Sequence, residues 1–341
     1  MYMRTLLLLI LFLFTFNVFS QDVHFSQFSE TPLQSNPALA GLFSGDVRMQ
    51  AVTRTQWQSI TVPFQTNSLN AEFKIPVGKG NDFMTFGASI LHDQAGTIAM
   101  TATNFMPTIN FHKSLSDERN LYLSAGFMEG IIQRNLDKSK ITTNAQFDGT
   151  NYIPGSDNGE PASLAGYTYL DGAAGLSLNG QLTQNENDNF FVGIALHHFN
   201  KPSQASFFHN DKVAVLPKWV VDAGIRTAID EVSFMTFFGE FAKQGPSREI
   251  IGGMLYSYKL EGNEDSKYII HGGGYLRWND AIIPVIKLEY KPVTVGLSYD
   301  ANISELKAYS QGRGGFELSL TFQQYRNRDA SSVNATRCPK F

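Results

Sequence analysis

Histidines and carboxylates are the residues of this chain best suited to chemistry, and most of the histidines stand in pairs. His197 and His198 are neighbours in a segment where every second residue is apolar. Adjacent residues of a strand point to opposite faces, so we expect this pair not to chelate one metal ion. Two other pairs have the residue types for acid–base chemistry or metal binding, His92 with Asp93 and His209 with Asp211. Neither has a defined third partner, and we predict no catalytic or metal site at either.

One acidic stretch has the oxygen ligands that calcium prefers. It has the sequence FDGTNYIPGSDNGE and carries Asp148, Asp157 and Glu160. It lacks the regular ligand spacing of a calcium-binding loop. We therefore interpret this stretch as a solvated loop.

Motifs of nucleophilic catalysis are absent from the sequence. The chain contains no Gly-x-Ser-x-Gly elbow, and no serine stands in an evident relation to a histidine and an acid. Cys338, the single cysteine, lies in a polar C-terminal stretch, where a structural role is favoured over a nucleophilic one. We predict no enzyme, no cofactor and no metal. A hydrolase built into a barrel would need an acid and a histidine within hydrogen-bonding reach.

The elements that must position these residues are strands. Between Phe191 and Phe199, Val192, Ile194 and Leu196 alternate with small or polar residues, and a period of two residues is typical of a β-strand. Fourteen candidate strands lie near 47–57, 68–75, 83–91, 98–112, 121–134, 169–178, 190–199, 219–229, 232–241, 248–258, 268–278, 281–290, 292–299 and 315–323. Single-chain barrels of bacterial outer membranes have an even number of strands, so we expect about 14, within 12 to 16.

Composition excludes several classes of protein. Hydrophobic residues make up 43% of the chain and charged residues 17%, with a formal net charge of -4 and a mean hydropathy of -0.17. A mildly acidic chain is a poor candidate for nucleic-acid binding. Residues 1–20, with Arg4 before an apolar run and Ser20 at its end, have the pattern of a cleaved signal peptide. No later run is apolar and long enough for a membrane helix, which leaves strands as the elements that would cross a membrane.

Alternating strands fit a soluble sandwich as well as a membrane barrel, but the placement of charges favours the barrel. Asp222 and Arg226 share one face of a strand, opposite Val221 and Ile225. Charges of both signs on one face suit a polar lumen, whereas a charge facing lipid is costly. A sandwich would instead turn that face to water.

Loop lengths and aromatic residues favour the same class. The long connections 135–168, 200–218 and 300–314 all follow odd-numbered strands, so they share one end of the molecule. In outer-membrane barrels the long loops gather at the cell exterior. Aromatic residues near strand ends suggest interfacial girdles; they include Tyr167, Tyr169, Phe190, Trp219, Trp278, Tyr290 and Tyr299. We predict an all-β, antiparallel transmembrane β-barrel of the outer membrane.

The two ends of the chain lack a strand pattern. We divide the chain into a signal peptide (1–20), an N-terminal segment (21–45), a barrel (46–323) and a C-terminal tail (324–341). In the N-terminal segment, Pro37 interrupts any helix and Asn36 suits a turn. With Phe25 and Phe28, this segment could be a plug in the barrel, a periplasmic contact surface or an ordered lead-in to the first strand. We expect the tail in the periplasm or folded back on the barrel.

Several short motifs occur in order along the chain. They are HFSQF, NPALAG, GLSYD, GRGGFE and the ending RCPKF. Together with the length and the signal peptide, these motifs resemble the PorP/SprF family of Bacteroidetes outer-membrane proteins, associated with type IX secretion and gliding motility. The resemblance is close at both ends and limited to the strand pattern in the middle.

The resemblance implies a barrel that acts through protein contacts beside the type IX secretion machinery. It would bind, anchor or hand over a secreted, adhesin-like surface protein through its loops and rim, without making or breaking bonds. Candidate contact or plug residues are Phe25, Phe28, Asn36, Pro37, Arg313, Cys338 and Phe341. Arg313 stands among glycines that permit either a tight turn into the last strand or a partner contact. The alternative is a barrel that transports small solutes, like a porin or a fatty-acid channel.

Overall fold

The computed structural model describes most of the chain outside its two ends. The described residues are 22–58, 62–153, 155–159, 165–185, 187–203, 206–207, 213–262, 266–305, 307–310 and 312–324. The predicted signal peptide, the pair His209 and Asp211, Glu160, Cys338 and Phe341 lie outside these residues.

Strands dominate the described part of the chain. The strands are β1 (Val47–Gln56), β2 (Phe64–Pro76), β3 (Phe83–Ala95), β4 (Met100–Ser116), β5 (Leu121–Asn135), β6 (Gly166–Gln181), β7 (Asn189–His197), β8 (Lys218–Ala228), β9 (Ser233–Gln244), β10 (Ser247–Lys259), β11 (Tyr268–Arg277), β12 (Ala281–Tyr290), β13 (Val293–Asn302) and β14 (Arg313–Gln324). The short helical turns are η1 (Phe28–Glu30), α2 (Pro32–Ser35), η2 (Pro37–Leu39), η3 (Lys138–Lys140), η4 (Asn144–Gln146) and α3 (Lys307–Ser310).

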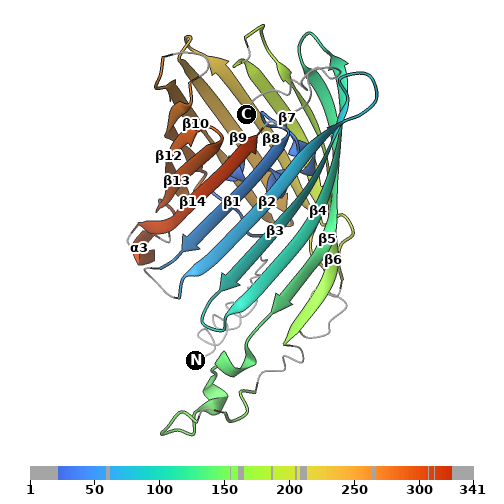
Figure 1. Cartoon of the computed structure of the whole chain (residues 1–341). Helices are drawn as coiled ribbons and strands as arrows, with labels where there is room; N and C mark the ends of the chain where they lie inside the picture. Colours follow the sequence, from blue (N-terminus) through green and yellow to red (C-terminus); the bar gives the residue numbers. More distant parts are fainter. Residues whose placement is uncertain are drawn as a thin grey trace, which may run out of the picture.

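The sheet closes on itself. Each strand pairs antiparallel with its neighbours in sequence, and β1 pairs with β14 to complete the barrel. The closing register joins Val47 to Gln324 at one end and Gln56 to Gly315 at the other. Figure 1 shows the tilted strands of this barrel. The predicted antiparallel barrel of 14 strands is confirmed.

The alternation of side chains explains why these sequences form a barrel instead of a sandwich. In β2, Ser68, Asn70 and Glu72 point inward and are buried, while Leu69 and Phe73 point outward and are 52% and 48% exposed. A soluble protein would bury the apolar face. Here the apolar face is the outer one, as it is in a barrel surrounded by lipid. Among the described residues, no helix is long and apolar enough to span a membrane.

The two ends of the barrel differ in their connections. Connections after odd-numbered strands include the long ones, 136–165, 198–217 and 303–312; we call that end the long-loop rim. The other end has only shorter turns, and we call it the short-turn rim. In Figure 1 the green β5–β6 connection extends beyond the lower end of the barrel, and α3 lies at the same end. The long loops therefore share one end, as predicted from the sequence.

Four of the seven predicted girdle aromatics are exposed on the outer surface, whereas Tyr167 and Tyr169 share the inward face of β6. Trp219, Trp278, Tyr290 and Tyr299 are between 41% and 63% exposed. Tyr169 is only 8% exposed and points into the lumen with Asp171, two residues along β6. The girdle assignment of Tyr169 was wrong because proximity to a strand end does not fix which face a residue occupies.

Candidate functional site: the lumen and its inner segment

Residues 22–46 lie inside the barrel, and we call them the inner segment. Its polar atoms bond to inward-facing side chains from widely separated strands, including Asn110 of β4, Asp222 of β8 and Glu317 of β14. The candidate residues Phe25, Phe28, Asn36 and Pro37 all belong to it and are buried. The structure therefore brings these four together in the lumen.

A buried carboxylate holds the first part of the inner segment. The two oxygens of Glu317 accept hydrogen bonds from the backbone N–H groups of Ser26, at 2.6 Å, and Gln27, at 2.8 Å. The Gln27 side chain accepts a hydrogen bond from Ser319 at 2.8 Å. Gly296 of β13 leaves room for that side chain, since a Cβ atom there would come within 2.8 Å of Gln27 Oε1. The backbone of the inner segment is thus fixed to the β13–β14 wall.

Two arginines and two carboxylates form a buried network around this contact. Arg54 lies 2.9 Å from Asp300 and 3.3 Å from Glu317, and Arg277 lies 3.1 Å from Asp300. Ser26 joins the network through bonds to Asp300 and Arg277. These side chains are at most 4% exposed, so loss of one partner would leave a buried charge uncompensated.

Glycines of the adjacent strands β5 (Gly126), β6 (Gly175) and β7 (Gly193) form a seat for Asn36 and Pro37. A Cβ atom at Gly175 of β6 would overlap Asn36 Oδ1, and one at Gly126 of β5 would overlap the Pro37 backbone. In the space that these glycines leave, Asn36 donates a hydrogen bond to Asp222 at 2.9 Å and accepts one from the Ala38 N–H group at 2.9 Å. Asn36 thereby caps η2, in agreement with the predicted turn at Asn36–Pro37.

The inner segment ends at the β2–β4 wall near the short-turn rim. Asn110 of β4 donates to the carbonyl oxygens of Ala38 and Ala40 at 2.8 Å. Glu72 of β2 accepts from the Gly41 N–H group at 2.8 Å and from Arg48 at 2.7 Å. Gly41 has a φ of +87°, a conformation that glycine adopts without strain. These contacts leave little of the β1–β7 inner wall in contact with water.

A histidine near the long-loop rim binds the start of the inner segment. His198 lies 2.7 Å from Asp22 of the inner segment and 2.6 Å from Asp171 of β6. Lys218 lies 3.4 Å from Asp22. The expectation that His197 and His198 point to opposite faces was wrong, since both are 7% exposed and bond inside the barrel. The reason is that β7 ends at His197 and His198 has a φ of +56°, which turns its side chain inward.

The protonation of His198 fits an ion-pair role. Burial lowers its pKa, but hydrogen bonds and charges of Asp171 and Asp22 outweigh burial and raise the pKa from 6.5 to about 9. Burial raises the pKa of Asp22, but Lys218 and His198 outweigh burial and lower it below its ordinary value of 3.8. Both groups are therefore charged at neutral pH.

This geometry predicts a pH-dependent stability. A raised histidine pKa stabilises the folded state fully below about pH 6.5, and this contribution is lost as the pH rises through about 9. It is worth about 3 kcal/mol. Heat-unfolding temperatures of the purified barrel should fall across this range, and His198→Gln should flatten that part of the profile. His92→Gln is the control, because His92 bonds only to Thr103 among the described residues. An unchanged profile in His198→Gln would contradict the ion-pair role.

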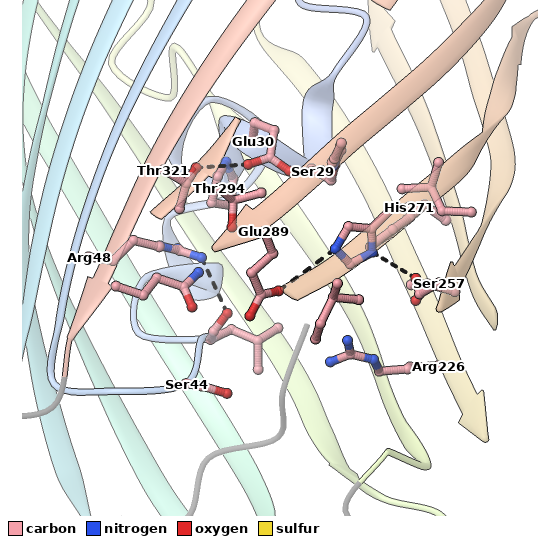
Figure 2. A pocket seen from close by; sticks show the side chains of 18 of the residues that line it. Ser29, Glu30, Ser44, Arg48, Arg226, Ser257, His271, Glu289, Thr294 and Thr321 are labelled. Carbon is pink, nitrogen blue, oxygen red and sulfur yellow. Dashed lines mark hydrogen bonds and ion pairs between the residues drawn. The ribbon is translucent and has the colours of Figure 1, made fainter. Parts of the chain in front are cut away.

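A cavity of about 1140 Å³ remains between the inner segment and the β8–β12 wall. Figure 2 shows it from close by, with His271 bonded to Ser257 and facing Glu289. The Ser257 Oγ atom lies 2.7 Å from His271 Nδ1, and Glu289 lies 3.7 Å from Nε2. The sequence alone does not indicate this relation, because the three residues are on three different strands. All three residues line the cavity, but the 3.7 Å between Glu289 and the ring is longer than a hydrogen bond, and we interpret them as wall structure.

The other predicted chemical groups are dispersed. His92 bonds to Thr103 and Asp93 to Thr66, while Asp148 accepts from backbone N–H groups of its own loop. Arg313 is exposed in the first position of β14, just after Gly312, whose φ is +75°. Within the described residues, no three His, Cys, Asp or Glu side chains gather as a metal site.

Three of the motifs that carry the family resemblance meet in space. HFSQF supplies Ser26 and Gln27, GLSYD supplies Gly296 and Asp300, and GRGGFE supplies Glu317. Of the charges in these motifs, only Arg313 was predicted as a contact residue; Asp300 and Glu317 were not. Such contacts could have been suspected from an acidic residue at a lumen-facing position of a strand, because a buried charge needs a partner.

The fold and the lumen define the class of protein. A closed antiparallel barrel with an apolar exterior and a charged interior is a transmembrane β-barrel of the outer-membrane type. Residues 17–322 match the model of the family described as "Type IX secretion system membrane protein PorP/SprF". The chain belongs to this family, which confirms the resemblance seen in its motifs.

Other comparisons add only general likeness. No curated protein sequence matches the chain. Among solved structures it is similar to the P. putida toluene transporter TodX, with 8% identity, a TM-score of 0.47 and coverage of 86% of this chain and 94% of that one. It is also similar to Acinetobacter baumannii Omp33, with 9% identity, a TM-score of 0.41 and coverage of 82% and 98%. Likeness at this level supports no argument about function.

Proposed function

We propose that this barrel is a non-enzymatic component of type IX secretion that binds, anchors or hands over a secreted cell-surface protein. The long-loop rim faces the cell exterior and provides the contact surface. The inner segment acts as a plug that keeps the lumen closed. Secretion components meet the short-turn rim and the C-terminal tail in the periplasm.

The observation that supports this proposal best is the occupied lumen. Inward side chains that would line an open pore are dry, including His112, Ser124 and Asn179, each with 0% exposure. A barrel whose own chain occupies the lumen beside β1–β7 presents rims and loops to its surroundings instead of a continuous channel. Membership of the PorP/SprF family indicates that these contacts would be made within the type IX secretion system.

The β5–β6 connection is the most prominent candidate for the partner contact. It is organised by η3 and η4, by a capping box at Thr143, and by a bridge between Phe147 and Tyr152. Phe147, Tyr152 and Ile153 are 53%, 44% and 46% exposed. Exposed aromatic and aliphatic side chains on an ordered loop are the usual anchors of a protein interface.

Replacing residues 137–164 by a short Gly-Ser linker tests this role. The pairing of Asn135 with Gly166 should persist, so the barrel should fold. Recovery of the cross-linked surface protein with the tagged barrel should fall at least about tenfold, because few anchors carry most of an interface's free energy. The matched control replaces residues 261–266 at the short-turn rim. Equal recovery with both variants would contradict the loop's role.

Deletion of the gene tests the proposal as a whole. A defined surface protein should disappear from the cell exterior, and complementation should restore it. An unchanged surface proteome and unchanged motility would contradict the proposal. Solute transport is the alternative function, and conductance separates the two, because a transport barrel forms a stable open pore.

A further inference from the structure

The cavity beside the inner segment has features of a binding site that the proposed contact role does not use. It reaches the short-turn rim, because the exposed residues Lys291 and Pro292 of the β12–β13 turn line it. Its volume of about 1140 Å³ is slightly larger than that of most small-molecule pockets, about 300–1,000 Å³. A ligand can therefore enter from that rim and be enclosed.

The deep part of the cavity is apolar. Phe28 of the inner segment, Phe238 of β9 and Leu255 of β10 line it. The rings of Phe28 and Phe238 are 6.1 Å apart at an angle of 83°, and Phe28 also lies 5.4 Å from the Tyr275 ring. Leu39, Leu42 and Phe191 continue this surface on the other side of Phe238. A ligand that fills this part must present hydrocarbon.

The mouth of the cavity is rich in cations. Arg226 is near the end of β8, Lys259 ends β10, and Lys291 follows β12, so all three lie toward the short-turn rim. Glu289, which also lines the cavity, is two positions before Lys291 and faces His271 at 3.7 Å. The cavity's other mouth-side carboxylate, Glu30, is in an ion pair with Lys287. Lys259 donates a hydrogen bond to the carbonyl oxygen of Glu231, and Arg226 lies over the Phe234 ring at 3.9 Å; neither of these partners is charged in that contact. Among the described residues that line this part of the cavity, positive charges therefore outnumber negative ones.

Two more carboxylates lie deeper and do not cancel this asymmetry. Asp222 accepts a hydrogen bond from Asn36 and is 2% exposed. Glu240 lies opposite Asp222 in the β8–β9 register, seven positions from the start of β9. At about 3.3 Å per strand residue, this pair lies far from the mouth. A cavity with an apolar floor and a cationic mouth is complementary to an amphiphile that has a hydrocarbon chain and an anionic head.

We propose that the cavity binds an acyl chain with an anionic head, the chain against Phe28, Phe238 and Leu255 and the head at Arg226, Lys259 and Lys291. The shared chemistry is that of a free fatty acid or a single-chain phospholipid. The ligand enters from the short-turn rim and leaves the inner segment in its seat. Binding at this cavity is independent of partner contacts at the long-loop rim.

Fluorescence titration with dansyl-labelled undecanoic acid tests the site. The folded barrel is held in amphipol, because detergent would compete as an amphiphile. We expect saturable binding that palmitic acid displaces, with palmityl alcohol weaker by about tenfold because it lacks the charge. A parallel titration uses lysophosphatidic acid as the competitor. Comparison of its affinity with that of palmitic acid shows whether the site prefers a single-chain phospholipid or a free fatty acid. Absence of saturable binding would overturn the proposal.

Variants separate the mouth from the floor. Lys259→Gln combined with Lys291→Gln should weaken binding of the acid about tenfold and leave the alcohol unchanged. Phe238→Trp, which fills the floor, should weaken both ligands. Lys113→Gln is the matched control, an exposed lysine of β4 toward the same rim. Heat-dependent gel mobility verifies folding of each variant. Equal binding of acid and alcohol by the wild-type barrel, or an unchanged preference in the double variant, would contradict the assigned head site.

Discussion

Gly175→Val releases the inner segment from its seat while the barrel stays closed. The added side chain would occupy the position of Asn36 Oδ1. Displacement of Asn36 from the seat would also break its hydrogen bond to Asp222. Overpacking of this kind costs about 1–3 kcal/mol. Because the strain is confined to the contact between segment and wall, the segment can yield without loss of the β5–β6 and β6–β7 pairing.

Thiol labelling measures this release. In a Cys338→Ser background, a cysteine introduced by Ala40→Cys is protected, since Ala40 is 0% exposed. Adding Gly175→Val should raise the maleimide labelling rate by roughly 5- to 150-fold, which corresponds to the expected free energy. Gly239→Val is the matched control, because a Cβ atom at Gly239 of β9 meets no atom within 4 Å. A folded Gly175→Val barrel that labels at the control rate would show that the glycine seat does not hold the segment.

Glu317→Ala should destabilise the barrel more than any surface charge substitution. It removes the acceptor of the Ser26 and Gln27 N–H groups and one partner of Arg54. Breaking a buried pair by removing one partner costs about 3–5 kcal/mol. The loss is large because the contact joins the two ends of the sequence at a site that water does not reach.

Urea unfolding in micelles, followed by gel mobility, measures that cost. Asp82→Asn is the comparison, because Asp82 pairs at 2.7 Å with Lys113, which is 57% exposed. Exposed pairs contribute about 0–1 kcal/mol, so this variant should unfold close to the wild type. If Glu317→Ala and Asp82→Asn unfold at the same urea concentration, the buried network does not stabilise the protein.

The barrel was predictable from the sequence because its signals are local. Alternation within β2 or β7 assigns a strand without knowledge of its partners, and the two-residue period separates the face of Val192 and Ile194 from the lumen. The parity of long loops follows from counting strands. The two-residue period does not predict where a side chain points once the strand has ended. The orientation of His198 was predicted wrongly because its backbone leaves the strand conformation.

The site was predictable only in part because its contacts are distant in sequence. Phe25, Phe28, Asn36 and Pro37 were identified as an irregular, apolar stretch, and that much is visible in composition. Their partners were not, since the contact from Ser26 to Glu317 spans 291 positions. The role of the glycines of β5 and β6 was not predicted either. A glycine in a strand can indicate that another segment packs closely against it, but the sequence does not show which segment that is.

Single-channel recording in planar bilayers tests the central claim most directly, namely that the inner segment closes the lumen and that the barrel works through protein contacts. The purified wild-type barrel is predicted to insert without a stable open conductance, whereas the Gly175→Val barrel, with its segment unseated, is predicted to show open steps. A stable open pore in the wild-type protein would contradict the account and favour the transport function.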